Sequence, residues 1–220
     1  MEMCVQHLPV PRMGSIQEST QRQLAIRRLI VAVAKHKFAR VGYEGASLDD
    51  IRHAADVTWE DLLAHFESKA TLLKAVLHEG WKNLGPRLAD IAFSSENARL
   101  SMLALLGLMS NVLQQDEDWM RLMLFEGRSP DPESGEICVS DGYGKFLHLC
   151  TELVVRGQKE GTFRTEYHPE VVSSMLVGAI EGIMRDRLRA EQRSGFTPYS
   201  GTYLMAVFDA LVSYLGPEAR

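Results

Sequence analysis

The sequence of 220 residues has few cysteines and no long uninterrupted apolar run. Its three cysteines, Cys4, Cys138 and Cys150, are an odd number without the spacing of a metal site. The longest apolar stretch, Leu100–Leu113, contains polar residues and is shorter than the roughly 20 residues that a membrane span needs. We therefore expect no membrane span and a reducing, cytoplasmic location.

The N-terminus lacks the pattern of a secretory signal, because no basic region is followed by an apolar block and a small-residue cleavage site. We interpret residues 1–18 as a disordered leader. Residue patterns for catalysis are also missing. The seven histidines form no H-x-x-x-H pair, and the segment Ser140–Lys145 lacks the spacing and the final Ser or Thr of a P-loop. We expect no enzyme activity, no metal and no cofactor.

Positive charge is scarce overall and unevenly distributed. The formal net charge is −5, which argues against a protein that coats nucleic acid through bulk charge. Residues 1–46 carry seven Arg or Lys against three Glu, a balance of 7 − 3 = +4. Residues 48–67 carry only Arg52 against six Asp or Glu, a balance of 1 − 6 = −5. A local basic patch near the N-terminus can still contact nucleic acid.

What the sequence has in plenty is helical periodicity, so we predict an all-α fold. Apolar residues at three- and four-residue steps predict a first helix over Ser19–Val41, with Gly42 as its stop. Ser47 is placed to cap a second helix, Leu48–Ala55, and Asp56 is expected at a corner with positive φ. Thr58 can cap a third helix that ends near Glu67.

A fourth helix is predicted from Lys69, with a kink or break at Gly85–Pro86. The loop predicted over Glu126–Glu136 is rich in Pro, Gly and Ser. Further helices are expected over Ala98–Gln114, Asp118–Phe125, Gly142–Lys159, His168–Gln192 and Tyr199–Leu215. The resulting division is a small helix-turn-helix domain over residues 19–67 and a larger helical domain over residues 68–220.

Four segments in order, Phe38–Val57, Leu62–Leu77, Arg156–Arg164 and Leu176–Met184, carry a family resemblance. The chain resembles the tetracycline-repressor (TetR) family of bacterial transcriptional regulators. The resemblance implies a homodimer in which an N-terminal helix-turn-helix domain binds a double-stranded DNA operator. It also implies a C-terminal domain that holds a small apolar ligand and the dimer interface. The expected function is that of a ligand-responsive, DNA-binding regulator, and we expect it to act as a repressor.

The predicted recognition helix departs from the family pattern. The family commonly has Lys-Gly-Thr at its start and a phosphate-contacting Tyr further on, where this sequence has Trp59, Glu60, Asp61 and then Leu63. Glu60 and Asp61 favour the helix dipole, or they repel phosphate. Trp59 either stacks on DNA or covers a neighbouring domain. We predict a weak phosphate-binding set, with these candidate DNA contacts: Arg27, Arg28, Ser47, Thr58, Trp59, Glu60, Leu63, His65 and Lys69.

Weak phosphate binding leaves a second function open, a TetR-like dimer that has lost its operator and serves as a ligand-binding or protein-interaction module. Clusters of Met and aromatic residues form either core or an apolar pocket. The candidate pocket residues are Met109, Trp119, Met123 and Phe146, with His148 and Arg121 as polar anchors. A G-x-x-x-G pair suggests close helix packing, and the candidate dimer residues are Gly178, Gly182, Met184, Phe208 and Leu211.

Overall fold

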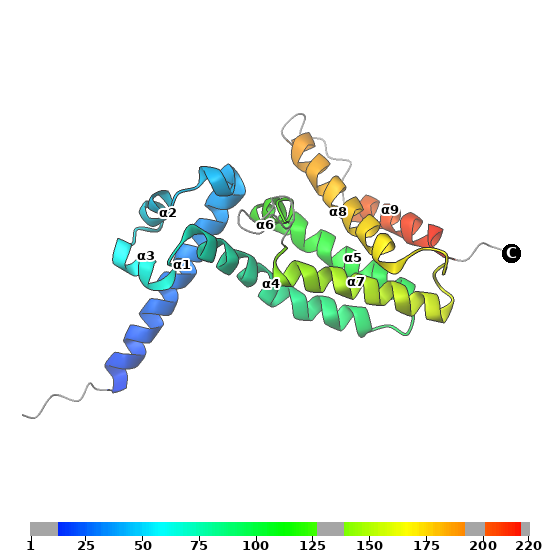
Figure 1. The fold of residues 1–220 in the computed structure, drawn as a ribbon, viewed down its shortest axis with the longest axis horizontal. Coiled ribbons are helices and arrows are strands. Elements are labelled where there is room, and N and C mark those ends of the chain that lie inside the picture. Colours follow the sequence, from blue (N-terminus) through cyan, green and yellow to red (C-terminus); the bar gives the residue numbers. More distant parts are fainter. Residues whose placement is uncertain (1–12, 127–138, 192–200, 217–220) are drawn as a thin grey trace, which may run out of the picture.

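The computed structural model describes residues 13–126, 139–191 and 201–216, and every regular element within these ranges is a helix (Figure 1). The all-α prediction is confirmed. The helices in chain order are α1 (Met13–Gly45), α2 (Leu48–Ala55), α3 (Trp59–His65), α4 (Lys69–Phe93), α5 (Ala98–Gln115), α6 (Glu117–Met123), α7 (Asp141–Glu160), α8 (Pro169–Glu191) and α9 (Gly201–Tyr214). Among the described residues, no helix is long and apolar enough to cross a membrane.

Helices α2 and α3 lie beside α1 at one end of the molecule, and α4 leads from them into the larger bundle (Figure 1). Their contact surface is apolar because Ile30, Phe38, Ile51, Leu62 and Phe66 are all buried there. These side chains recur at helical spacing, so one face of each helix turns inward. The same packing leaves the opposite face of α3 in solvent.

The predicted turn signals of this domain are confirmed. The Ser47 hydroxyl accepts a hydrogen bond from the Asp50 backbone N–H at 3.0 Å and caps α2. Asp56 has φ 50° and ψ 46°, the left-handed conformation expected at the corner. Thr58 and Asp61 form a reciprocal capping box at the start of α3. Local chemistry therefore fixes both ends of the corner.

Helix α1 begins before the predicted Ser19 and continues past Val41. The stop predicted at Gly42 is nevertheless a real interruption, because Gly42 has φ 75° and lies outside helical geometry. A last short turn then runs to Gly45. Residues 1–12, which belong to the predicted leader, lie outside the described part of the chain.

Of the kink or break predicted at Gly85–Pro86, the break is wrong, because α4 runs from Lys69 to Phe93 with Pro86 inside it. Proline costs the helix one hydrogen bond and crowds the preceding turn. Buried Leu84, Leu88 and Ala92 lie on both sides of the proline and hold the helix against its neighbours. Packing therefore overrides the local signal.

The larger domain is a bundle in which α4 packs on α5 and α7, α7 packs on α8, and α5 packs on α9. An aromatic cluster fills its centre near α6. The Trp81 ring centroid lies 5.8 Å from that of Trp119, edge to face, and 5.9 Å from that of Phe146, stacked. The predicted loop Glu126–Glu136 falls almost wholly outside the described residues.

Candidate DNA-reading face and ligand cavity

The outward face of α3 consists of Trp59, Glu60, Leu63 and Ala64, all of which are exposed. Trp59 is 43% exposed and Leu63 is 49% exposed, large values for apolar side chains. Leu62 points the other way and is fully buried. The face that a helix-turn-helix would turn toward DNA is thus apolar and acidic.

Two of the predicted DNA contacts use their hydroxyls for caps. Ser47 Oγ donates to Asp50 Oδ2 at 2.7 Å while it accepts from the Asp50 N–H. Thr58 Oγ1 donates to Asp61 Oδ2 at 2.8 Å and accepts from the Asp61 N–H at 3.0 Å. Both side chains are exposed at helix starts, so they set the position of α2 and α3.

Trp59 does not act alone on this surface. The Arg52 guanidinium lies 5.3 Å from the centroid of the Trp59 ring, and it donates to Asp49 Oδ1 at 2.9 Å. A cation over an indole face is attracted by the ring quadrupole. The basic side chain in the middle of the helix-turn-helix is therefore engaged by a ring and a carboxylate.

Lys69 and His65 have other roles than those predicted. Lys69 Nζ donates to the backbone oxygens of Tyr43 at 2.8 Å and Ala46 at 3.1 Å, so it ties the start of α4 to the end of α1. His65 is half-buried beside Phe66, and its Nε2 is shielded from solvent. Neither side chain points freely outward, because Lys69 is bound to backbone oxygens at the junction of α1 and α2 and His65 packs beside Phe66.

Arg27 is likewise turned inward. Its Nη1 lies 3.4 Å from Glu79 Oε1 on α4, and its guanidinium lies 5.5 Å from the centroid of the Phe66 ring. Arg28, the next residue, is exposed and keeps the predicted access to solvent. Helix periodicity separates the two by about 100°, which is why adjacent arginines have different surroundings.

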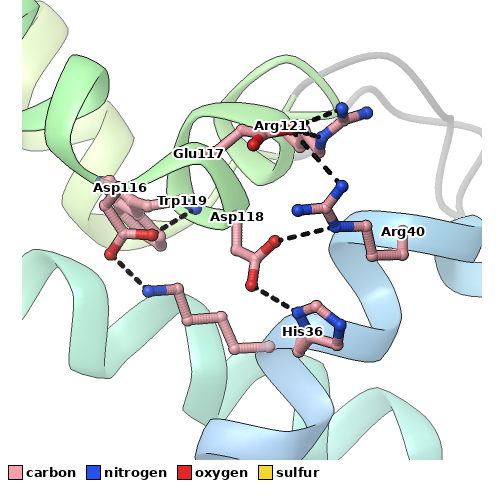
Figure 2. A network of polar contacts seen from close by, with 8 residues as sticks. His36, Arg40, Asp116, Glu117, Asp118, Trp119 and Arg121 are labelled. Carbon is pink, nitrogen blue, oxygen red and sulfur yellow. Dashed lines mark hydrogen bonds and ion pairs between the residues drawn. The ribbon is translucent and has the colours of Figure 1, made fainter.

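A network of ion pairs joins α1 of the helix-turn-helix domain to the start of α6 (Figure 2). His36 Nδ1 lies 2.8 Å from Asp118 Oδ2, and Arg40 Nε lies 3.4 Å from Asp118 Oδ1. Arg40 also pairs with Glu117 at 3.5 Å. Lys35 Nζ bonds to Asp116, which at the same time caps α6 through the Trp119 N–H. Three acidic residues in a row thus bind one basic face of α1.

A cavity with a volume of about 1380 Å³ lies along α4 and α7. One end is closed by the last turns of α1, through Phe38, Val41, Gly42, Tyr43 and Glu44. On α4 the lining extends from Ala70 to Phe93, about 35 Å at a rise of about 1.5 Å per residue. The cavity is long, and its wall belongs to both domains.

Basic residues line this cavity at four-residue steps. Lys74, His78 and Lys82 follow one another on α4, all exposed, and we call them the basic row of α4. Leu73, Leu77 and Trp81 lie beside them and supply an apolar wall. This side of the cavity suits a ligand with an apolar body and a negatively charged group, and the lining outside α4 also includes the acidic residues Glu44, Glu126, Asp141 and Glu152. Sequence reasoning missed the basic row, although its i, i+4, i+8 spacing was visible.

The ends of α6 and α7 meet at the same cavity. Glu126 accepts hydrogen bonds from the Ser140 backbone N–H at 2.9 Å and from Ser140 Oγ at 2.6 Å. Both residues line the cavity, so this contact closes its wall between the two helices. This contact joins the chain on either side of residues 127–138, which the structure does not describe.

Only two of the six predicted pocket residues, Phe146 and His148, line the cavity. Met109, Trp119 and Met123, also predicted to line a pocket, are buried in the bundle and do not line this cavity. Arg121 pairs with Glu117 on the same helix at 2.6 Å, where it cannot anchor a ligand in the cavity. Trp119 instead packs edge to face on Trp81 of α4 within the bundle.

The predicted dimer residues separate into two groups. Met184 is 1% exposed and Phe208 is fully buried within the chain, so neither is available to a second copy. Gly178 is exposed, and a Cβ placed on Gly178 or Gly182 would meet no atom of the chain within 4 Å. Leu211 is half-buried. An open strip with small residues therefore remains on α8.

Two buried groups in the bundle have shifted pKa values. Burial raises the pKa of the Cys150 thiol to about 12, so the thiol stays protonated and unreactive at neutral pH. Burial, followed by the hydrogen bond to Glu181, raises the pKa of Tyr143. The Tyr143 hydroxyl donates to Glu181 Oε1 at 2.6 Å and ties α7 to α8. These groups have structural roles.

Comparison with solved structures identifies the same fold. The transcriptional regulator FadR from Bacillus subtilis, in complex with stearoyl-CoA, superposes with a TM-score of 0.70 at 16% identity, covering 86% of this chain and 96% of FadR. The ketosteroid transcriptional regulator KstR2 of Mycobacterium tuberculosis superposes with a TM-score of 0.68 at 17% identity, covering 87% and 95%.

The HTH-type transcriptional regulator YuxN of Bacillus subtilis (strain 168) is 24% identical over 172 residues, or 77% of this chain. The chain spans 56% of the length of YuxN. Residues 30–76, from the second half of α1 to the first turns of α4, match the family of bacterial regulatory proteins of the tetR type. The helix-turn-helix segment is therefore similar to that of the tetR-type regulators, and the described bundle has the fold of the solved regulators FadR and KstR2.

Proposed function

We propose that this protein is a ligand-responsive regulator whose affinity for operator DNA is set by an elongated amphipathic anion in the cavity along α4. The observation that carries the proposal is the cavity wall, which includes Phe38–Glu44 of the helix-turn-helix domain. A ligand that fills this end contacts the DNA-binding domain directly. Its binding energy can therefore favour one placement of that domain over another.

The basic row and the shape of the cavity support this class of ligand. Lys74, His78 and Lys82 would face the negative group, while Leu77, Trp81 and other apolar residues would face the body of the ligand. The related FadR was solved with stearoyl-CoA, a molecule with a long apolar chain and phosphate groups. We propose an acyl thioester or a ligand of similar chemistry.

The ion pairs between α1 and α6 offer a second connection between ligand and DNA. Leu122, Phe125 and Glu126, at the end of α6 or just after it, line the cavity, and residues at its start hold α1. A ligand that displaces α6 would change the pairing of Asp118 with His36 and Arg40 (Figure 2). The expected sign is repression, with ligand binding releasing DNA.

Titration with stearoyl-CoA tests the proposal. We expect stearoyl-CoA to raise the melting temperature and to lower the affinity for fluorescent duplex DNA measured by anisotropy at low salt. Coenzyme A without the acyl chain is the control and should act far more weakly. A protein that binds duplex but ignores stearoyl-CoA would contradict the proposed ligand. A protein that binds no duplex even at low salt would instead favour a ligand-binding or interaction module.

We also propose that the regulator is a homodimer through the open strip of α8. Val171, Met175 and Gly178 are exposed on this strip, and Gly182 is half-exposed. Leu211 of α9 also belongs to the predicted interface. Gly178→Leu should block close approach of a second helix and produce monomers or aggregates in light scattering. An unchanged dimer mass would place the interface elsewhere.

A further inference from the structure

The four side chains on the outward face of α3 present almost no hydrogen-bond donors. Glu60 accepts hydrogen bonds only, and Leu63 and Ala64 are apolar. Trp59 is a donor through its indole N–H alone, and its ring is engaged with Arg52. The remaining residues of α3 turn inward, into the capping box at Asp61, the core at Leu62 and the half-buried site of His65.

This chemistry restricts which bases α3 can contact. Guanine in the major groove offers two acceptors and is read by Arg or Lys, and adenine is read by the paired donor and acceptor of Asn or Gln. None of these residue types lies on the outward face of α3. Cytosine offers an amino group as a donor, which a carboxylate can accept, and thymine offers a methyl group that apolar side chains contact.

Arg52 is the basic residue of α2, and it does not supply the missing donor. Its guanidinium donates to Asp49 at 3.1 Å and 2.9 Å, lies over the Trp59 ring and approaches the Val57 carbonyl oxygen at 3.5 Å. A bidentate contact with guanine would require these contacts to break. The side chains of α3, together with the engaged Arg52, are therefore poorly suited to recognise a purine.

We infer that α3 reads pyrimidines, with Glu60 accepting a hydrogen bond from a cytosine amino group and Leu63 with Ala64 contacting a thymine methyl group. This inference rests on the proposed DNA-binding function. It explains how an acidic recognition helix can be specific: the acidic side chain that weakens attraction to phosphate is also the side chain that selects one base. The operator half-site should then contain adjacent C and T on the strand that faces α3.

Selection from a randomised duplex pool at low salt tests this, with full-length protein and sequencing of the retained DNA. The unmodified protein should enrich C and T at neighbouring positions of each half-site. Glu60→Gln should replace the cytosine preference with adenine at that one position, by about five- to tenfold, because an amide reads adenine. Glu96→Gln removes the same charge from an exposed residue of the α4–α5 connection and should keep the original sequence.

Replacing thymine by uracil in the selected duplex removes only the methyl group and should weaken binding two- to fivefold, about what one apolar methyl contact contributes. Leu63→Ala should reduce this difference between the two duplexes, because it removes the larger of the two apolar side chains that contact the methyl group. The inference would be overturned if the selected sites were purine-rich on that strand, or if Glu60→Gln selected the same bases as the unmodified protein. Either result would leave the proposed function standing. Failure of every variant to retain DNA would overturn both.

Discussion

The basic side chains of the helix-turn-helix domain and those of α4 are used in opposite ways. In the first region Arg27, Lys35 and Arg40 point toward the larger domain and pair with its carboxylates. In the second region Lys74 and Lys82 remain exposed along the cavity. The comparison shows that basic residues of the helix-turn-helix domain join it to the larger domain, whereas Lys74 and Lys82 stay exposed on the cavity wall, Lys82 with a 3.9 Å ion pair to Glu79 of its own helix.

The difference has a consequence for regulation. A pair between exposed charges contributes little by itself, but three acidic residues on α6 act together on one face of α1. Each also lies within a helix whose far end touches the cavity. The basic face of α1 is thereby linked to the cavity, and the proposed ligand response would act through this link.

The contact between α4 and α6 gives the largest expected effect. A Cβ on Gly80 would lie 2.2 Å from two atoms of the buried Trp119 ring, so Gly80→Ala must displace that ring and α6 with it. We expect a loss of about 1–3 kcal/mol in the free energy of unfolding, measured by urea denaturation. Gly144→Ala, inside α7, where a Cβ would meet only Val139 Cγ2 at 3.9 Å, should gain about 0.5–1 kcal/mol. Equal effects of the two variants would mean that Trp119 does not constrain α6.

Removing the basic row should weaken the ligand without affecting the fold. The double variant Lys74→Gln/Lys82→Gln takes two positive charges from the cavity wall, and we expect stearoyl-CoA affinity to fall about tenfold or more. Calorimetric titration measures it. Lys159→Gln removes one positive charge from an exposed site near the end of α7, outside the cavity lining, and as a control it should have no effect. Unchanged affinity of the double variant would place the negative group of the ligand elsewhere.

Breaking the ion pairs at α6 should loosen the link between the domains. Asp118→Asn keeps the size of the side chain but removes the charge that holds His36 and Arg40. We expect the free energy of unfolding to fall by about 1 kcal/mol and to depend less on salt. The coupling between ligand and DNA, measured as the ratio of DNA affinities with and without stearoyl-CoA, should shrink. If that ratio stays constant, the cavity wall on α1 carries the coupling.

The smallest effect concerns the DNA-reading end. Glu60→Lys reverses a charge on the outward face of α3, so nonspecific DNA affinity should rise and the slope of log affinity against log salt should steepen by about 0.9 per new phosphate contact. Glu96→Lys reverses a charge far from α3 and should leave the slope nearly unchanged. A steep slope in the unmodified protein would show that Arg28 and its neighbours already supply enough phosphate contacts.

Much of the helix-turn-helix could be predicted because its signals are local. Ser47, Asp56 and Thr58 act within three or four residues of themselves, through hydrogen bonds and backbone conformations that the sequence states directly. The outward position of Glu60 and Leu63 follows from helix periodicity. Lys69 and His65 could not be assigned in this way, because their partners depend on how two turns fold together.

The cavity shows where such reasoning fails. Met109 and Met123 have the same residue types as a pocket lining, and only the orientation of α5 and α6 decides that they pack in the core. Pro86 was a strong breaker signal, yet buried Leu84 and Leu88 keep α4 continuous. Without that continuity the basic row and the apolar wall would not lie along one cavity.

By itself the sequence determined the all-helical class, the order of the helices, the caps of the helix-turn-helix and the acidic, apolar chemistry of its outward face. These properties depend on short-range hydrogen bonding and on a period of about 3.6 residues. Both are set by residues that lie close together in the sequence. Only the tertiary structure decided that basic residues of α1 pair with acidic residues at the start of α6 and that α1, α4 and α7 line the cavity. Both depend on which helix faces meet across long stretches of chain, and that choice is made by the packing of the whole core.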